Sequence, residues 1–194
     1  VVGLLRVIKR WLHASGVLPV NQNLGEISNR TITRTATRVN PNVVGTSLFY
    51  EKKSRQEQRF RFIHISSLLP PKNPTGIVAA FEKLTGSGVD AELVMVGPPN
   101  ETLLNLLEEK KHLKDRLFLT GEISYAAVAD QLRKASASIL FSRVENLPCV
   151  VLESLCCGVP VISTRVGGIS EVIGPENGVL IDPGNESQLV EALK

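Results

Sequence analysis

The feature that most constrains the fold is one stretch in the C-terminal half, where apolar runs alternate with loops and a helical run. The apolar run ASASILF (residues 135–141) predicts a strand, and a polar loop follows it. Pro148 then stands where a helix would begin, because the first helical position needs no N–H donor. The helix is expected to stop at Gly158, and a short strand to run from Pro160 to Ser163. This order of elements is typical of an open α/β sheet, in which ligands bind at the carboxyl ends of the strands.

The same alternation extends back to residue 59 and forward to the last residues. Helices are expected over residues 75–84, 101–111 and 124–134, and again after Asn185. Six strands that alternate with helices predict a Rossmann-like α/β fold, with an open parallel sheet and helices on both faces. The four further strands are RFRFIHIS, AELVMVG, RLFLTG and GVLID.

The loop and helix start in the central stretch indicate a site for a nucleotide diphosphate. Unpaired N–H groups at a helix N-terminus attract phosphate. Glu153 would lie roughly 7.5 Å along the helix from Pro148, where its carboxylate could accept hydrogen bonds from ribose hydroxyls. Glu145, ahead of the helix, would lie on the sugar side of the phosphates. Spacing alone leaves open that both acids are merely solvated. The unpaired N–H groups would be presented by the segment that runs from Asn146 through Leu147, Pro148 and Cys149 to Val150.

The phrase ENLPCVVLESLCCGVPVIST, followed by VGGISEVI, resembles the donor-binding half of family 4 retaining glycosyltransferases, which have the two-domain GT-B fold. The motif of that family is Glu, seven residues, Glu, and Glu145 and Glu153 match it. The resemblance implies that Glu145 contacts the transferred sugar and that Glu153 binds the nucleotide ribose. It also implies a UDP-sugar or GDP-sugar donor, with no cofactor and no metal.

The loop after the first strand carries a second part of the resemblance. In the family, Gly-Arg-Leu is followed by Lys four residues after the Leu, and the Arg and Lys hold the donor diphosphate. Lys72 matches that Lys, whereas Ser67 stands at the Arg position. Serine can donate one hydrogen bond but cannot make a bidentate ion pair, so catalytic strength is in question. His64, in the preceding strand, is expected to be packed or hydrogen-bonded there.

The length of 194 residues suits one domain, or one domain plus a fragment. Residues 1–50 are expected to be the remnant of an N-terminal acceptor domain with its linker, because NPNVVGTSLF (residues 40–49) is similar to the family's interdomain phrase. Residues 51–194 are expected to be the nucleotide-sugar donor-binding domain, truncated at its C-terminus. The missing N-terminal domain would bind the acceptor, a glycan or a lipid-linked molecule.

Charge is concentrated in residues 1–62, which contain eleven Lys and Arg against three Glu. Basic segments can favour nucleic acid or an anionic membrane. No aromatic side chains interleave with these residues as they do in single-strand binders, so no nucleic-acid partner is expected. No run reaches the ~18 apolar residues of a membrane span. The three cysteines show no pairing pattern and are expected to be buried in a protein of a reducing compartment. A cytoplasmic location is expected, with peripheral contact to the inner face of the membrane as an option.

These features predict the donor-binding domain of a retaining hexosyltransferase, which in isolation should bind nucleotide without turnover. Two alternatives stay open. The first is a noncatalytic nucleotide-sugar-binding domain of the same fold, which the substitution at Ser67 supports. The second and weaker one is a sugar-nucleotide epimerase. The sequence does not specify the base, the sugar or the acceptor. UDP is expected as the nucleotide only because it is frequent in the family that the chain resembles.

Overall fold

The computed structural model describes residues 19–22, 26, 38, 40, 42–52 and 59–194. Most of the segment expected to be an acceptor-domain remnant, residues 1–50, therefore lies outside the described residues. The division of the chain at residue 50 stays a prediction.

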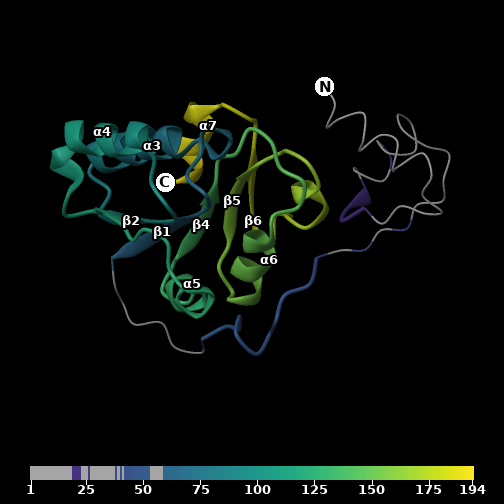
Figure 1. The fold of residues 1–194 in the computed structure, drawn as a ribbon. Coiled ribbons are helices and arrows are strands. Elements are labelled where there is room, and N and C mark those ends of the chain that lie inside the picture. Colours follow the sequence, from purple (N-terminus) through teal and green to yellow (C-terminus); the bar gives the residue numbers. More distant parts are fainter. Residues whose placement is uncertain (1–18, 23–25, 27–37, 39, 41, 53–58) are drawn as a thin grey trace, which may run out of the picture.

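One parallel sheet of six strands forms the centre of the molecule, as the sequence predicts (Figure 1). The strand order is β3-β2-β1-β4-β5-β6, and all five pairings are parallel. The strands are β1 (Phe60–Ile65), β2 (Ala91–Val96), β3 (Leu117–Leu119), β4 (Ala137–Leu140), β5 (Val161–Thr164) and β6 (Gly178–Ile181).

Helices cover both faces of this sheet, as expected. In Figure 1, α3, α4 and α7 lie on one face, and α5 and α6 lie on the other. Short 3-10 turns at Pro70–Lys72, Lys111–Leu113 and Ile169–Glu171 complete the connections. The helices are α3 (Pro74–Gly86), α4 (Glu101–Glu109), α5 (Tyr125–Leu132), α6 (Cys149–Cys156) and α7 (Glu186–Ala192).

Strand alternation explains why the sheet is buried on both faces. Successive side chains of a strand point to opposite faces, so Phe62 and Leu93 pack into the core beneath α3, α4 and α7. Ile63 and Val94 pack into the second core, on the α5 side. Burying a side chain of this size contributes about 1.5–3 kcal/mol, which is why parallel strands form near-continuous apolar runs.

Three helices begin at side-chain caps, and two of these caps, Ser124 and Asn185, were expected from the sequence. The side chains of Asn100, Ser124 and Asn185 each accept a hydrogen bond from a backbone N–H in the first turn. Such caps contribute about 0.5–2 kcal/mol each. The start of α6 differs from expectation by one residue. Pro148 is the N-cap rather than the first helical residue, because its ψ of 133° is extended. The predicted stop is confirmed, since Gly158 takes a φ of +67° just after the helix.

The strand order places a crevice between β1 and β4. From β1 the chain proceeds outward through β2 and β3, and from β4 it proceeds the other way through β5 and β6. The loops after β1 and β4 therefore diverge to opposite sides of the sheet. A point where the strand order reverses in this way is where open α/β sheets bind ligands.

Candidate functional site

A cavity of about 320 Å³ lies at this switch point, at the carboxyl ends of β1 and β4. Its walls come from the loop after β1, the loop after β4 and the first residues of α6. Two chain segments that the sequence analysis treated separately thus form one site. Six of the nine predicted site residues line it: Ser67, Lys72, Glu145, Pro148, Cys149 and Val150.

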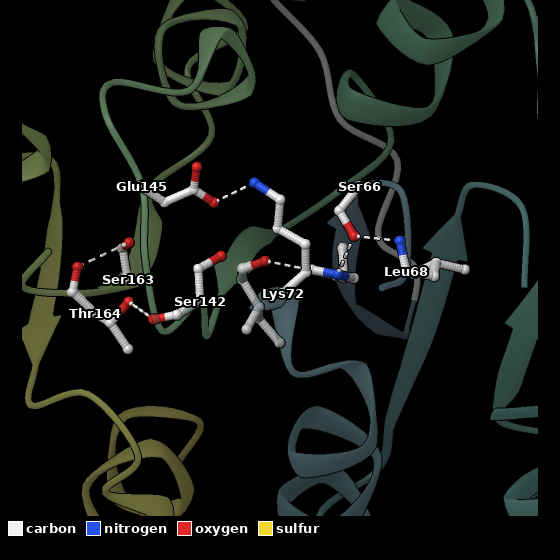
Figure 2. Close-up of polar contacts among 9 residues, drawn as sticks. Ser66, Leu68, Lys72, Ser142, Glu145, Ser163 and Thr164 are labelled. Carbon is white, nitrogen blue, oxygen red and sulfur yellow. Dashed lines mark hydrogen bonds and ion pairs between the residues drawn. The ribbon is translucent and has the colours of Figure 1, made fainter. Parts of the chain in front are cut away.

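The two predicted catalytic residues form an ion pair at the wall of this cavity. The Lys72 ammonium donates a 2.5 Å hydrogen bond to Glu145 Oε1 (Figure 2). The Glu145 side chain is only 7% exposed, so its carboxylate needs this partner in place of water. The pair joins the loop after β1 to the loop after β4 and puts one positive and one negative charge on the same wall.

Backbone contacts hold the surrounding loops against one another. The Arg143 N–H donates to the Pro71 carbonyl at 2.8 Å, which ties the Glu145 loop to the Lys72 loop. The glycine loop after β5 is fixed to the same place, because the Gly168 N–H donates to the Asn146 carbonyl at 2.6 Å. Only glycine fits at position 167, where φ is +58° and a Cβ would lie 2.2 Å from the Glu145 carbonyl oxygen.

His64 anchors the loop that carries Lys72. Its Nδ1 lies 2.8 Å from the Ile139 carbonyl, which can only accept, so Nδ1 carries the proton. Its Nε2 lies 2.8 Å from Ser66 Oγ, which in turn accepts a 2.9 Å hydrogen bond from the Leu68 N–H. These bonds, of which the one between Ser66 and Leu68 is drawn in Figure 2, stabilise Leu68 at a φ of +54°, a conformation uncommon for leucine. Burial lowers the pKa of His64 to about 4, so the ring is neutral near pH 7. The expectation of a hydrogen-bonded histidine is confirmed.

Glu153 lies away from the walls of the cavity, farther along α6. Its side chain is buried, and the Tyr125 hydroxyl donates a 2.7 Å hydrogen bond to its Oε1. That bond to a carboxylate raises the pKa of the Tyr125 hydroxyl to about 12. Tyr125 also makes an edge contact with Phe49, with ring centroids 5.0 Å apart, and Phe49 is fully buried.

Two of the residues predicted at the start of α6 lie away from the cavity, and the expected burial of Cys149 needs correction. Asn146 and Leu147 do not line the cavity: the carbonyl of Asn146 accepts from Gly168, and that of Leu147 accepts from the Asn42 side chain at 2.7 Å. Pro148 has no N–H, so it lines the cavity without donating. Cys149 is exposed, whereas Cys157 is buried as expected; the first turn of a helix at a cavity is less covered than its end against the sheet.

Three residues of the site region were missed by the sequence analysis. Ser142 lines the cavity with a fully buried side chain whose Oγ has no hydrogen-bond partner. Ser66 links His64 to the Lys72 loop, and Tyr125 covers Glu153. The only signal for Ser142 was its place at the carboxyl end of an apolar strand. Nothing in the sequence pairs Tyr125 with an acid 28 positions away.

The described residues contain neither a cluster of metal ligands nor a helix of membrane-spanning length. In residues 59–194 and the shorter described segments, no group of three or more His, Cys, Asp or Glu side chains could hold a metal ion. No helix of the described part is long and apolar enough to cross a membrane.

Comparison with known proteins identifies the family. The family model of glycosyl transferases group 1 matches residues 48–194, about three quarters of the chain. The chain belongs to this family. A curated relative, N-acetyl-alpha-D-glucosaminyl L-malate synthase of Bacillus anthracis, is 37% identical over 68% of the chain. The match spans 35% of that relative, so this glycosyltransferase domain covers about a third of its length.

Solved structures confirm the fold as that of a GT-B glycosyltransferase domain. Sucrose-phosphate synthase from Thermosynechococcus elongatus superposes with a TM-score of 0.86 over 98% of this chain and 51% of its own, at 22% identity. HepE from Anabaena, solved in complex with UDP, gives a TM-score of 0.75 over 92% of this chain and 52% of its own, at 21% identity. At these identities the likeness establishes the fold.

Proposed function

We propose that this domain binds a nucleotide-diphosphate sugar in the cavity between β1 and β4, as part of a longer retaining glycosyltransferase of family 4. The observation that carries the proposal is the Lys72–Glu145 pair, which the fold assembles from two distant loops at the switch point of the sheet. Family membership supports a transferase, and the UDP bound to HepE supports a uridine nucleotide as the first donor to test.

The diphosphate would lie against Lys72 and the first turn of α6. Lys72 supplies a cation, and the N–H groups of Cys149 and Val150 lie at the cavity wall without helical partners of their own. Both features favour anions. Since Ser67 lacks the charge of the family's arginine, Lys72 would carry most of the electrostatic stabilisation of the leaving group.

The two acids would divide the rest of the donor between them. Glu145, on the wall of the cavity beside Lys72, would accept hydrogen bonds from the transferred sugar. Glu153 lies farther along α6 than the walls of the cavity, and it would bind the ribose end of the donor there through Oε2, because Tyr125 donates to Oε1. Tyr125 would then keep the carboxylate in place for the nucleotide.

Transfer would proceed on the front face of the donor sugar. The acceptor hydroxyl oxygen forms a bond to the anomeric carbon while the bond to the β-phosphate oxygen breaks. That leaving oxygen takes the acceptor's proton, so the new bond has the configuration of the old one. The protein contributes position and charge, without metal or cofactor. The acceptor, a glycan or a lipid-linked molecule, would be bound by a separate N-terminal domain, of which residues 1–50 would be the remnant and linker.

Transfer by a longer protein that contains this domain tests the proposal. UDP-sugars and GDP-sugars would be offered with a panel of simple glycoside and lipid-linked acceptors. The anomeric configuration of any product would be read from its proton coupling constants by NMR. A product with the donor's configuration is expected. A product with the opposite configuration would contradict the retaining mechanism, but it would still be consistent with the proposed binding of the nucleotide-sugar donor.

A second candidate is a noncatalytic domain that binds the nucleotide sugar without transfer. The observation that favours it is Ser67, which is exposed at the cavity and leaves Lys72 as the one Lys or Arg among the cavity-lining residues. An epimerase on the same fold is the weaker alternative. Intact nucleotide binding with every common donor, together with the absence of transfer, would favour the noncatalytic domain.

A further inference from the structure

A buried hydroxyl without a partner faces the cavity. Ser142 lies two residues past the end of β4 and is 0% exposed, and its Oγ makes no hydrogen bond in the described structure. A buried hydroxyl normally has a hydrogen-bond partner in the protein, because it has lost its hydrogen bonds to water and an unpaired buried polar group destabilises the fold. Ser142 lines the cavity, and Figure 2 shows its side chain directed toward the Lys72–Glu145 pair.

The backbone around Ser142 is fixed, so its hydroxyl is already held for a ligand. The Ser142 carbonyl accepts a 2.7 Å hydrogen bond from Thr164 Oγ1, a side chain of β5 that is itself fully buried. The next N–H along the chain, that of Arg143, donates to Pro71. The Ser142 carbonyl and the Arg143 N–H are main-chain groups, so replacing the side chain of Ser142 leaves both hydrogen bonds in place.

The surroundings indicate what the hydroxyl binds. Lys72 and the N-terminal end of α6 both lie at this cavity and both attract anions. Glu145 is the acid nearby, and Lys72 offsets its charge. A hydroxyl can donate one hydrogen bond to a phosphate oxygen without adding a charge to the site.

We infer that Ser142 is a binding residue for the donor, and that its hydroxyl donates to the β-phosphate. The inference rests on the proposed function and adds a residue to it. It places just after β4 a neutral hydrogen-bond donor that partly replaces the arginine absent at position 67. Without ligand the hydroxyl is buried and unpaired, and with the diphosphate bound it gains its partner.

β4 offers a matched control for this inference. Ser138, four residues earlier, has an equally buried Oγ without a partner, but it does not line the cavity. Ser138→Ala and Ser142→Ala each remove one unpaired hydroxyl, so neither should lower the free energy of unfolding of the ligand-free chain. Chemical denaturation checks this, and any loss of ligand binding is then separable from damage to the fold.

The test is calorimetric titration of the 194-residue chain and both variants with UDP and with UMP, which lacks the β-phosphate. Ser142→Ala should weaken UDP binding about 3- to 10-fold and leave UMP binding unchanged. Ser138→Ala should change neither. Unchanged UDP affinity in Ser142→Ala, or equal losses for UDP and UMP, would overturn the assignment to the β-phosphate. If the unsubstituted chain binds GDP but not UDP, GDP and GMP replace UDP and UMP in the same titrations. If it binds neither UDP nor GDP, the proposed function fails first and this inference fails with it.

Discussion

The Tyr125 hydroxyl donates a 2.7 Å hydrogen bond to the Glu153 carboxylate, joining the first residue of α5 to the middle of α6. Phe49 packs against the edge of the tyrosine ring, so a segment that precedes the sheet contributes to the position of this acid. A buried carboxylate held in one orientation is a better ribose acceptor than a mobile one, because less side-chain entropy is lost on binding.

Tyr125→Phe should therefore weaken the binding of UDP by a few-fold while keeping the aromatic contact with Phe49. The reason is that Glu153 loses its neutral hydrogen-bond partner, a loss of about 0.5–1.5 kcal/mol. Calorimetric titration with UDP measures this change in affinity. Tyr50→Phe is the control: its ring lies 4.7 Å from the Arg133 guanidinium and no bond joins it to Glu153. Tighter UDP binding in Tyr125→Phe would instead show that Tyr125 competes with the ribose.

The two acids should respond differently to removal. Glu153→Ala removes the proposed acceptor for ribose hydroxyls, a loss of ~1.5–3 kcal/mol, so UDP or GDP affinity should fall by about one to two decades. Glu145→Ala should leave the affinity for bare nucleotide nearly unchanged and should depress transfer in the longer enzyme. Equal losses of nucleotide affinity in the two variants, with both proteins folded, would contradict this division of roles.

Stability should depend on pH through His64. Burial lowers its pKa from 6.5 to about 4, so the unfolded chain binds a proton between these values and the folded chain does not. The free energy of unfolding should therefore fall as the pH drops from 6.5 towards 4, by about 3 kcal/mol in total from this group. The measurement is urea denaturation across this range. His64→Asn, which can still donate to Ile139, is the comparison protein, and its curve should lack this part of the slope. Identical slopes would exclude His64 as the cause.

Restoring the missing cation should strengthen phosphate binding. Ser67→Arg puts a guanidinium at an exposed position of the cavity wall, and UDP affinity should rise about 3- to 10-fold, less than for a buried pair because solvent screens it. Leu104→Arg, which adds the same charge at an exposed position of α4, is the control for a general effect of net charge. An unchanged Kd in Ser67→Arg would mean that this position does not face the diphosphate.

Much of the fold could be predicted because parallel strands and capped helices leave local marks. The six strands and the caps at Ser124 and Asn185 follow from apolar runs and from single polar residues at helix starts. The pairing of Lys72 with Glu145 could be expected only through the family motifs, since 73 residues separate them.

The rest of the site depends on strand order and packing, which no local pattern contains. The reversal between β1 and β4 puts Ser142 at the cavity, and the packing of α5 beside α6 covers Glu153 with Tyr125. The spacing of Glu153 from Pro148 was compatible with a ribose contact, but it carried no information about the tyrosine. Likewise, the hydrogen bond that holds the His64 ring beside the turn at Leu68 needs β1 next to β4, because its partner is the carbonyl of Ile139 on β4.

The most direct test of the central claim is titration of the chain with UDP and GDP, with and without the Lys72 ammonium. Binding of at least one nucleotide below millimolar Kd is expected, and Lys72→Met should weaken it at least about tenfold, since a charged hydrogen bond contributes ~1.5–3 kcal/mol. Lys83→Met, which removes the same charge from an exposed pair with Glu186 on the α3–α7 side, should bind like the unsubstituted chain. No binding of either nucleotide at millimolar concentration, or equal binding by the Lys72→Met and unsubstituted chains, would contradict the account.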